Sequence, residues 1–153
     1  YDEIPGHPVW IAPDEWIGKA GDKQYPLHLV SPQPSDKLHS QLESALADLP
    51  GARPVTGLMN SLDASARGIT NGDIIRVYND RGSCLVRGAV SEGIRVGVIS
   101  IPTGAWYDPD EGGHDRHGNP NILTRDVGTS RIGQGSSAHT TLVEAEVWHS
   151  RND

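Results

Sequence analysis

Phenylalanine is absent from this chain of 153 residues, and cysteine and methionine occur once each. The single cysteine, Cys84, excludes an internal disulfide and a cysteine-based metal cluster. Its position in an apolar stretch predicts a buried, unreactive thiol. Without phenylalanine, the core has to be built from aliphatic side chains, tryptophan and tyrosine. A chain of this length can bury such a core as one domain.

Basic residues are few, because 13 lysines and arginines face 20 aspartates and glutamates and the net charge is -7. A general nucleic-acid binder carries a basic patch, so we do not expect nucleic acid as a partner. No apolar run approaches the ~20 residues that span a membrane, and no signal-peptide pattern opens the chain, so we do not expect a membrane partner either. Residue 1 is tyrosine. We therefore expect a processed product or a piece of a longer protein, with any targeting signal outside this sequence.

Turn-forming residues are abundant: the chain has 18 glycines and 11 prolines, and only 35% of its residues are hydrophobic. This composition favours short strands and many turns over a helical bundle. Short helices and tight turns without long crossover helices predict a mainly β fold, a small barrel that folds alone as a monomer because closed strand pairing leaves few edges. We expect strands over 25–30, 74–78, 84–90, 95–101 and 141–148, helices over 37–49 and 59–68, hairpin and turn residues at 79–82 and 71–73, and irregular structure over 102–118.

Residues 1–24 form an extended N-terminal arm or connector, because Pro5, Pro8 and Pro13 disfavour regular structure. The arm has apolar side chains that could dock on a surface. It packs either along its own domain or against other domains of a longer parent, and the sequence leaves both interpretations open.

The loop from Ser31 to Gln41 is the best candidate site. It follows an apolar stretch and is rich in small, polar and proline residues. Backbone donors at the end of a strand, with a few convergent polar side chains, suit a polar ligand that carries phosphate. The alternative is a proline-rich turn before an ordinary helix. The candidate binding residues of this loop are Ser31, Gln33, Lys37, His39, Ser40 and Gln41.

Two later segments strengthen this interpretation. One is Gly68-Ile-Thr-Asn-Gly-Asp-Ile-Ile-Arg-Val77, and the other is Gly118-Asn-Pro-Asn-Ile-Leu-Thr-Arg-Asp126 followed by Gly133-Gln-Gly-Ser-Ser-Ala-His139. With the loop after Val30, and in this order, they resemble the C-terminal dinucleotide-binding domain of molybdopterin oxidoreductases. The resemblance is to the subgroup of dimethyl sulfoxide, trimethylamine N-oxide and biotin sulfoxide reductases, and it runs from about Tyr25 to Trp148.

The resemblance implies a double-psi β-barrel with short helices, and it makes 25–153 a molybdopterin dinucleotide-binding domain. Such a domain grips and orients part of a bis(molybdopterin guanine dinucleotide). In the family the metal is held by pterin dithiolenes and one side chain of another domain, and no residue here matches that ligand. We therefore expect no metal ligand, no catalytic residue and no turnover by the isolated chain, with the other domains of the parent enzyme as partners.

The resemblance also implies specific contacts. It places Asn121, Gln134, Gly135 and Ser136 near the cofactor, whereas Asn119 precedes a proline and is expected to serve the turn only. Turn chemistry is the alternative for these amides. The family has arginine where Lys37 stands, and lysine lacks the bidentate fork, so a simpler phosphate contact is expected there. Biotin sulfoxide reductase-like parents are cytoplasmic and the respiratory reductases are periplasmic, so the compartment, cytoplasmic or periplasmic, stays undetermined.

Other interpretations are weaker. His114 and His117 lack a second pair of metal ligands, so a solvated loop is preferred to a metal site. Ser136, Ser137 and His139 lack the glycine-flanked turn of a hydrolase nucleophile. Trp106 either lines a substrate funnel or fastens a loop, and we favour the second. The runner-up function is a cofactor-free double-psi barrel that acts as a protein-binding module through the loop Ser31–Gln41.

Overall fold

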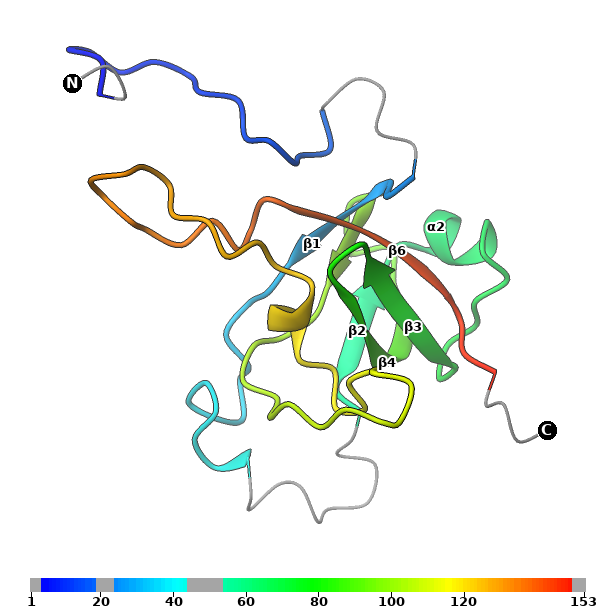
Figure 1. Cartoon of the computed structure of the whole chain (residues 1–153). Helices are drawn as coiled ribbons and strands as arrows, with labels where there is room; N and C mark the ends of the chain where they lie inside the picture. Colours follow the sequence, from blue (N-terminus) through cyan, green and yellow to red (C-terminus); the bar gives the residue numbers. More distant parts are fainter. Residues whose placement is uncertain (1–3, 19–23, 44–53, 150–153) are drawn as a thin grey trace.

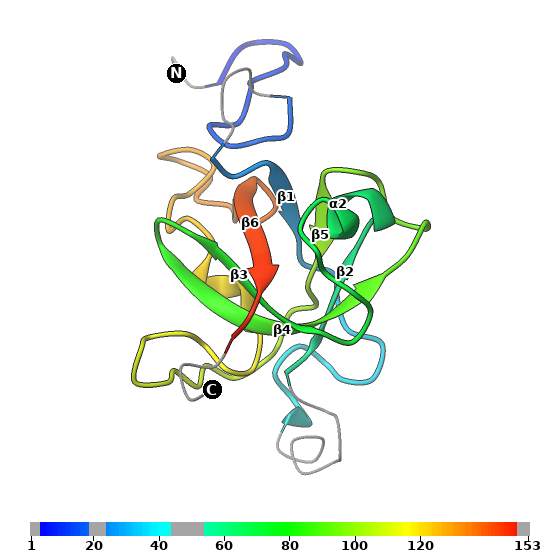
Figure 2. The ribbon, with the colours of Figure 1, turned by 90° about the vertical axis from the view of Figure 1, so that its right-hand side faces the viewer.

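The computed structural model describes residues 4–18, 24–43 and 54–149. Its strands close into a barrel in the order β1-β5-β2-β4-β3-β6, which Figure 2 shows from one side. The mainly β barrel predicted from the sequence is therefore confirmed. The strands are β1 Leu27–Val30, β2 Thr56–Met59, β3 Ile74–Asn79, β4 Gly82–Val90, β5 Val98–Ser100 and β6 Thr141–Val147.

The pairing pattern identifies the barrel as a double-psi fold. β1 pairs in parallel with β5, and β2 pairs in parallel with β4. Antiparallel pairs connect these two units and close the barrel, with β1 against β6, β2 against β5, and β3 against both β4 and β6. Because the barrel is closed, its strands leave no long unpaired edge among the described residues.

The core lies inside the barrel and is aliphatic, as the lack of phenylalanine requires. Strand β3 alternates between buried and half-buried residues, so Ile75 and Val77 point inward. Cys84 is buried as well, and burial raises the pKa of its thiol far above the ordinary value, so the expected unreactive thiol fits its place. The largest completely buried apolar side chains are Leu27, Leu29, Met59, Ile75, Ile99, Ile101, Leu123, Val77, Val86 and Val143.

Short-range signals placed several elements correctly. The expected helix over 59–68 is α2, Ser61–Ser65, in which the Asn60 side chain accepts a hydrogen bond from the Leu62 amide. Gly68 follows with a positive φ of 65°. β3 and β4 form the expected hairpin across residues 79–82. The residues 102–118 contain no helix or long strand.

Two elements differ from the sequence-based expectation. Strand β2, Thr56–Met59, was not predicted, because it is four residues long and contains a glycine, which weakens a local strand signal. The expected strand over 95–101 is shorter, since only Val98–Ser100 pair with neighbouring strands.

The helix expected over 37–49 is wrong for its first six residues. Residues 37–42 form turns and an isolated bridge, and both His39 and Leu42 have positive φ values, 52° and 69°. The leucines that gave the helical spacing, Leu38 and Leu42, are 63% and 58% exposed, so no core contact stabilises a helix there. Residues 44–49 lie outside the described part of the chain.

Within residues 4–18, 24–43 and 54–149, the structure contains no helix that is both long and apolar enough to cross a membrane.

Candidate functional site

The candidate loop begins at Ser31, directly after β1. Ser31 is 8% exposed, and its hydroxyl Oγ is buried without a hydrogen-bond partner among the described residues. A buried hydroxyl that lacks a partner costs free energy, so native proteins rarely leave one unsatisfied unless a ligand or water completes it. The end of β1 therefore has a polar atom available for a ligand.

His28 contributes a second such atom. Its Nε2 lies 2.6 Å from the carbonyl oxygen of His139, and a carbonyl can only accept, so Nε2 carries the proton. In the neutral ring Nδ1 is then an acceptor, and it is buried without a partner within the described residues. His28 alternates with the core residues Leu27 and Leu29 along β1, which keeps its side chain out of the core.

His139 links the end of β1 to the segment before β6. In addition to its carbonyl contact with His28, its Nδ1 accepts a hydrogen bond from the Ser31 amide over 3.4 Å. That distance is beyond the usual range for such a bond, so the bond is weak. Sequence reasoning considered His139 only as a hydrolase residue and missed this contact. A spacing of 108 residues gives no local signal for it.

Farther along the loop, two of the candidate residues serve the loop itself. The Lys37 ammonium forms an ion pair with Glu43, and the two side chains are 6% and 4% exposed. The Gln33 side chain donates to the Lys37 carbonyl at 3.0 Å. Both groups thus hold the loop in its turned path, and the ammonium of Lys37 is directed to a carboxylate of its own chain.

His39, Ser40 and Gln41 are exposed and form the outer part of the loop. The segment after β5 supports them, because the indole Nε1 of Trp106 donates to the Ser40 carbonyl at 3.1 Å. Gly104 packs so closely that an added Cβ would lie 2.0 Å from the His39 carbonyl oxygen. The hydrogen bond from Trp106 to Ser40 agrees with the interpretation that Trp106 fastens a loop.

The second candidate region starts at the 3-10 helix η1, Pro120–Ile122. The Asn119 side chain accepts a hydrogen bond from the Asn121 amide at 3.0 Å, so Asn119 serves the turn, as expected. The side chain of Asn121 is exposed. Asn119 thus has the turn role that was expected, whereas a cofactor contact by Asn121 stays a prediction.

Gln134, Gly135 and Ser136 lie in an exposed loop that is held by its own backbone. The Gln134 side chain donates to the carbonyls of Ser130 and Arg131 at 2.8 and 3.1 Å. The Gly135 carbonyl accepts from the Thr129 amide at 2.9 Å. Gln134 therefore closes a turn in this conformation. A ligand contact by its amide would use the remaining side-chain oxygen or a rearranged side chain.

The carboxylate of Asp115 organises the segment before η1, a role that no local pattern around this residue predicts. Asp115 is completely buried, and its two oxygens accept from the amides of Asp108 and Asn119 at 2.7 and 2.6 Å. Hydrogen bonds of this kind between a carboxylate and amides are strong. Asp115 therefore fixes the start of the turn that presents Asn121.

The two histidines near Asp115 have different partners. His114 Nδ1 lies 2.5 Å from the Ser83 hydroxyl, and its ring packs edge-on against Trp148. His117 Nε2 lies 3.0 Å from an Asp108 oxygen. The structure therefore gives each histidine a contact within the protein.

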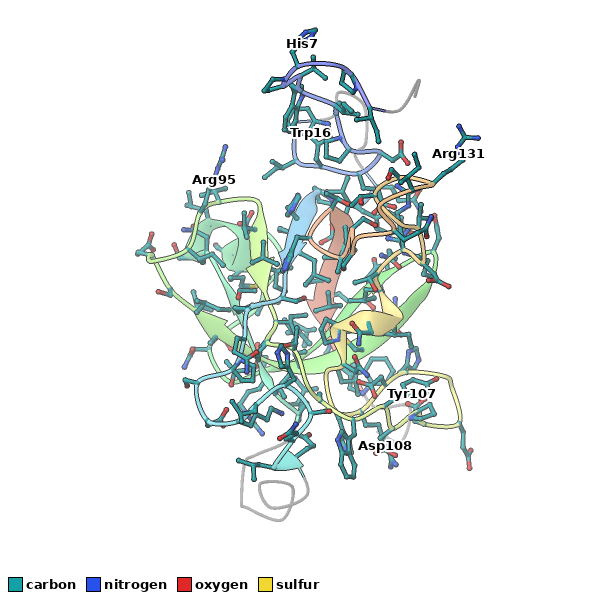
Figure 3. All side chains as sticks on the ribbon, turned by 90° about the vertical axis from the view of Figure 1, so that its left-hand side faces the viewer. His7, Trp16, Arg95, Tyr107, Asp108 and Arg131 are labelled. Atoms are coloured by element: carbon teal, nitrogen blue, oxygen red, sulfur yellow. The ribbon has the colours of Figure 1, made fainter. Side chains whose placement is uncertain are left out.

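The two candidate regions lie on one side of the barrel but at different heights. In Figure 1, η1 (gold) lies at the left between the 37–43 segment below it and the 125–137 segment above it. Figure 3, which faces that side, shows the same vertical order, with Arg131 near the upper end and Tyr107 near the lower end. Whether His39, Asn121 and Gln134 contact one ligand stays a prediction.

Comparison with known proteins places this chain in a family. Residues 27–142 match the model of the molydopterin dinucleotide binding domain. Biotin sulfoxide reductase of Cereibacter sphaeroides is 48% identical over 95% of this chain, which covers 20% of that protein. Trimethylamine-N-oxide reductase 1 of Escherichia coli K12 is 48% identical over 97% of the chain, which covers 18% of that protein.

Among solved structures, acetylene hydratase from Pelobacter acetylenicus matches with a TM-score of 0.71 at 19% identity, over 92% of this chain and 21% of the other. This likeness concerns the fold alone. The chain spans about a fifth of the length of the curated relatives it matches. The family model covers most of the barrel and both candidate regions, and on this evidence the chain belongs to the molydopterin dinucleotide binding domain family.

Proposed function

We propose that this chain binds and orients part of a bis(molybdopterin guanine dinucleotide), as the C-terminal domain of a molybdenum-dependent sulfoxide or N-oxide reductase. The family match and the reductases among its relatives support the cofactor and the reaction class. Their greater length supports a larger parent with further domains. When bound, the cofactor supplies the molybdenum redox chemistry of oxide reduction.

The observation that carries the proposal is that two buried polar atoms, the hydroxyl of Ser31 directly after β1 and Nδ1 of His28 within β1, lack a hydrogen-bond partner among the described residues. The hydroxyl offers a donor and the imidazole nitrogen an acceptor, and the exposed side chains of the loop after β1 add further polar groups. Pterin and guanine edges alternate donors and acceptors, so this donor set fits the cofactor. A module that only docks proteins has no need for such buried unsatisfied atoms.

The residues divide into groups that contact the ligand and groups that support them. The proposed contacts have exposed side chains, or buried polar atoms without a partner among the described residues: His28, Ser31, His39, Ser40, Gln41 and Asn121. Lys37 and Gln33 hold the loop, as their contacts within it show. A phosphate contact by Lys37 would require it to leave Glu43. Gln134, Gly135 and Ser136 are proposed to meet the cofactor on the second loop.

The domain boundaries follow the same reasoning. We propose that residues 25–153 form the cofactor-binding domain and that 1–24 are a connector from the preceding part of the parent. The family match begins at residue 27, at the first residue of β1. The alternative function, a cofactor-free barrel that binds proteins, is less favoured because the family is defined by dinucleotide binding.

The Ser31→Ala substitution in the full-length protein tests this function. Because the hydroxyl has no partner in the part of the chain that the structure describes, its removal should leave the free energy of unfolding unchanged or slightly higher. The affinity for the cofactor should fall about tenfold or more. The fall is measured as less molybdenum and less guanine nucleotide retained per protein. Ser65→Ala, an exposed serine in α2, is the control and should retain the wild-type content. Wild-type cofactor content in Ser31→Ala would count against the proposed site.

A further inference from the structure

Glu15, in the N-terminal arm, makes a three-point contact with the barrel. Its carboxylate accepts two hydrogen bonds from the guanidinium of Arg81, at 2.7 and 2.9 Å, and a third from the Leu142 amide at 2.9 Å. A bidentate arginine–carboxylate pair is geometrically specific. The Glu15 side chain is only 19% exposed, so the contact is largely shielded from solvent. Figure 3 shows the arm, marked by Trp16, packed at the upper end of the barrel.

Arg81 also contacts the second candidate region and so connects it to Glu15. Its Nε donates to the Leu123 carbonyl at 2.7 Å, immediately after η1. The Asn79 side chain donates to the same carbonyl at 2.9 Å and to the Leu142 carbonyl at 3.1 Å. Asn79 is buried, so these bonds are held at the edge of the core. The backbone that presents Asn121 is therefore tied to the β3–β4 hairpin and to the start of β6.

The arm contacts both ends of the segment of residues 126–141. Arg125, just before that segment, pairs with Asp14 at 2.7 Å and has its Nε 3.9 Å from Glu15. Leu142 lies just after the segment. Two adjacent residues of the arm thus contact the backbone or side chains at both ends of residues 126–141, the segment that contains Gln134 and Ser136.

We propose that Glu15 is a positioning residue for the dinucleotide site: it holds η1 and both ends of the 126–141 segment in place through Arg81, Leu142 and Arg125. The inference rests on the proposed function, because the segments it holds are the proposed cofactor contacts. Under this proposal the arm is part of the site's scaffold. Glu15 itself does not touch the ligand and acts only through the groups it holds.

Glu15→Gln in the full-length protein tests the proposal, because glutamine keeps the shape and one acceptor but loses the charge and one arginine bond. Hydrogen exchange of the cofactor-free protein should show faster exchange over residues 119–142. The loaded protein should release the dinucleotide, followed as guanine nucleotide lost from the protein, about tenfold faster than wild type. Arg81→Lys, which loses the bidentate fork and the Nε bond, should shift both measurements in the same direction. Glu146→Gln removes a carboxylate paired with Arg76 on the outside of the barrel, and it should change neither.

The outcomes are distinct. Faster exchange together with faster release in Glu15→Gln and Arg81→Lys supports the positioning role. Unchanged exchange in both variants overturns it, and so does faster exchange with wild-type release, because the arm would then order a loop that does not contact the ligand. A wild-type protein that holds no dinucleotide would instead refute the proposed function. If Glu15→Gln does not fold, Arg81→Lys alone decides between these results.

Discussion

The imidazole Nε2 of His28 donates to the carbonyl oxygen of His139 over 2.6 Å, joining β1 to a segment 111 residues later in the chain. The same histidine, His139, accepts a bond from the Ser31 amide. This pair of contacts sets the position of the loop after β1 relative to the loop before β6. Both loops contain proposed cofactor contacts, so the His28–His139 relationship links the two halves of the site.

Replacing His28 by alanine should therefore affect both stability and cofactor. Loss of one hydrogen bond should lower the free energy of unfolding by about 1 kcal/mol, as urea denaturation would measure. Cofactor retention in the full-length protein should fall as well, because the two loops lose their link. His7→Ala, an exposed histidine of the arm, should leave both values at wild type. Equal stability of His28→Ala and wild type would contradict the contact.

The Lys37–Glu43 pair should respond asymmetrically to mutation. Lys37→Ala removes the ammonium that pairs with the buried carboxylate of Glu43, which should cost about 3 to 5 kcal/mol in the free energy of unfolding. Lys37→Met combined with Glu43→Leu removes both charges and should recover most of that loss. Denaturant titrations of the single and double variants check this. A double variant as unstable as the single one would show that the pair is not coupled.

Gly104 should not tolerate alanine. Its φ is +97°, and a Cβ would lie 2.0 Å from the His39 carbonyl, so the backbone of one segment has to move. Gly104→Ala should lower the free energy of unfolding by roughly 1 to 3 kcal/mol, and it should also displace the His39 loop and reduce cofactor retention. The matched control is Gly68→Ala, with a φ of +65° but nothing within 4 Å of the added atom. Thermal denaturation measures the effect, and an equal fall in melting temperature in the two variants would argue against the steric contact.

Acid should weaken the contact of the arm through Glu15. Burial raises the pKa of this carboxyl, but the bonds from Arg81 and Leu142 and the charges of Arg81 and Arg125 outweigh burial, so its pKa lies below the ordinary value. A lowered pKa in the folded state contributes stability above the unfolded pKa, about 4.3, and that contribution is lost as the pH falls through the folded value.

Urea denaturation of wild type and Glu15→Gln between pH 7 and pH 3 measures this effect. The stability difference between the two proteins should be largest at neutral pH and should shrink below about pH 4, near the ordinary glutamate pKa. A difference that stays constant over the whole range would show that the charge of Glu15 has no part in folding. Asp73, whose pKa is also lowered by its bonds from Thr70, is present in both proteins and cancels in the comparison.

The exposed contacts His39 and Asn121 should matter for the cofactor and not for the fold. Alanine at either position in the full-length protein should lower cofactor affinity about tenfold, since each lost hydrogen bond to the ligand costs roughly 1 to 3 kcal/mol. The free energy of unfolding should change little, as expected for exposed side chains. Wild-type cofactor content in both variants would mean that these residues do not contact the ligand.

Local patterns in the sequence determined much of the barrel. The β-branched and aromatic residues of 74–78 after the turn at 71–73 predicted β3, and the residues at 79–82 predicted the hairpin. A cap at Asn60 or Ser61 was expected for the short helix, and Asn60 caps α2. Each of these signals acts over a few residues, and here the tertiary contacts of the barrel agree with it. The order of three motifs along the chain was also visible, and it sufficed to indicate the family that residues 27–142 match.

Only the tertiary structure decided the path of the candidate loop and the contacts that hold the site. Lys37 to Leu42 have a helical spacing of apolar residues, yet the buried bond between Lys37 and Glu43 and the contact with Gly104 hold them in turns. The links from His28 to His139 and from Glu15 to Leu142 join residues 111 and 127 positions apart. No periodicity encodes such pairs, because closure of the barrel brings together strand ends and loops that have no local relationship in the sequence.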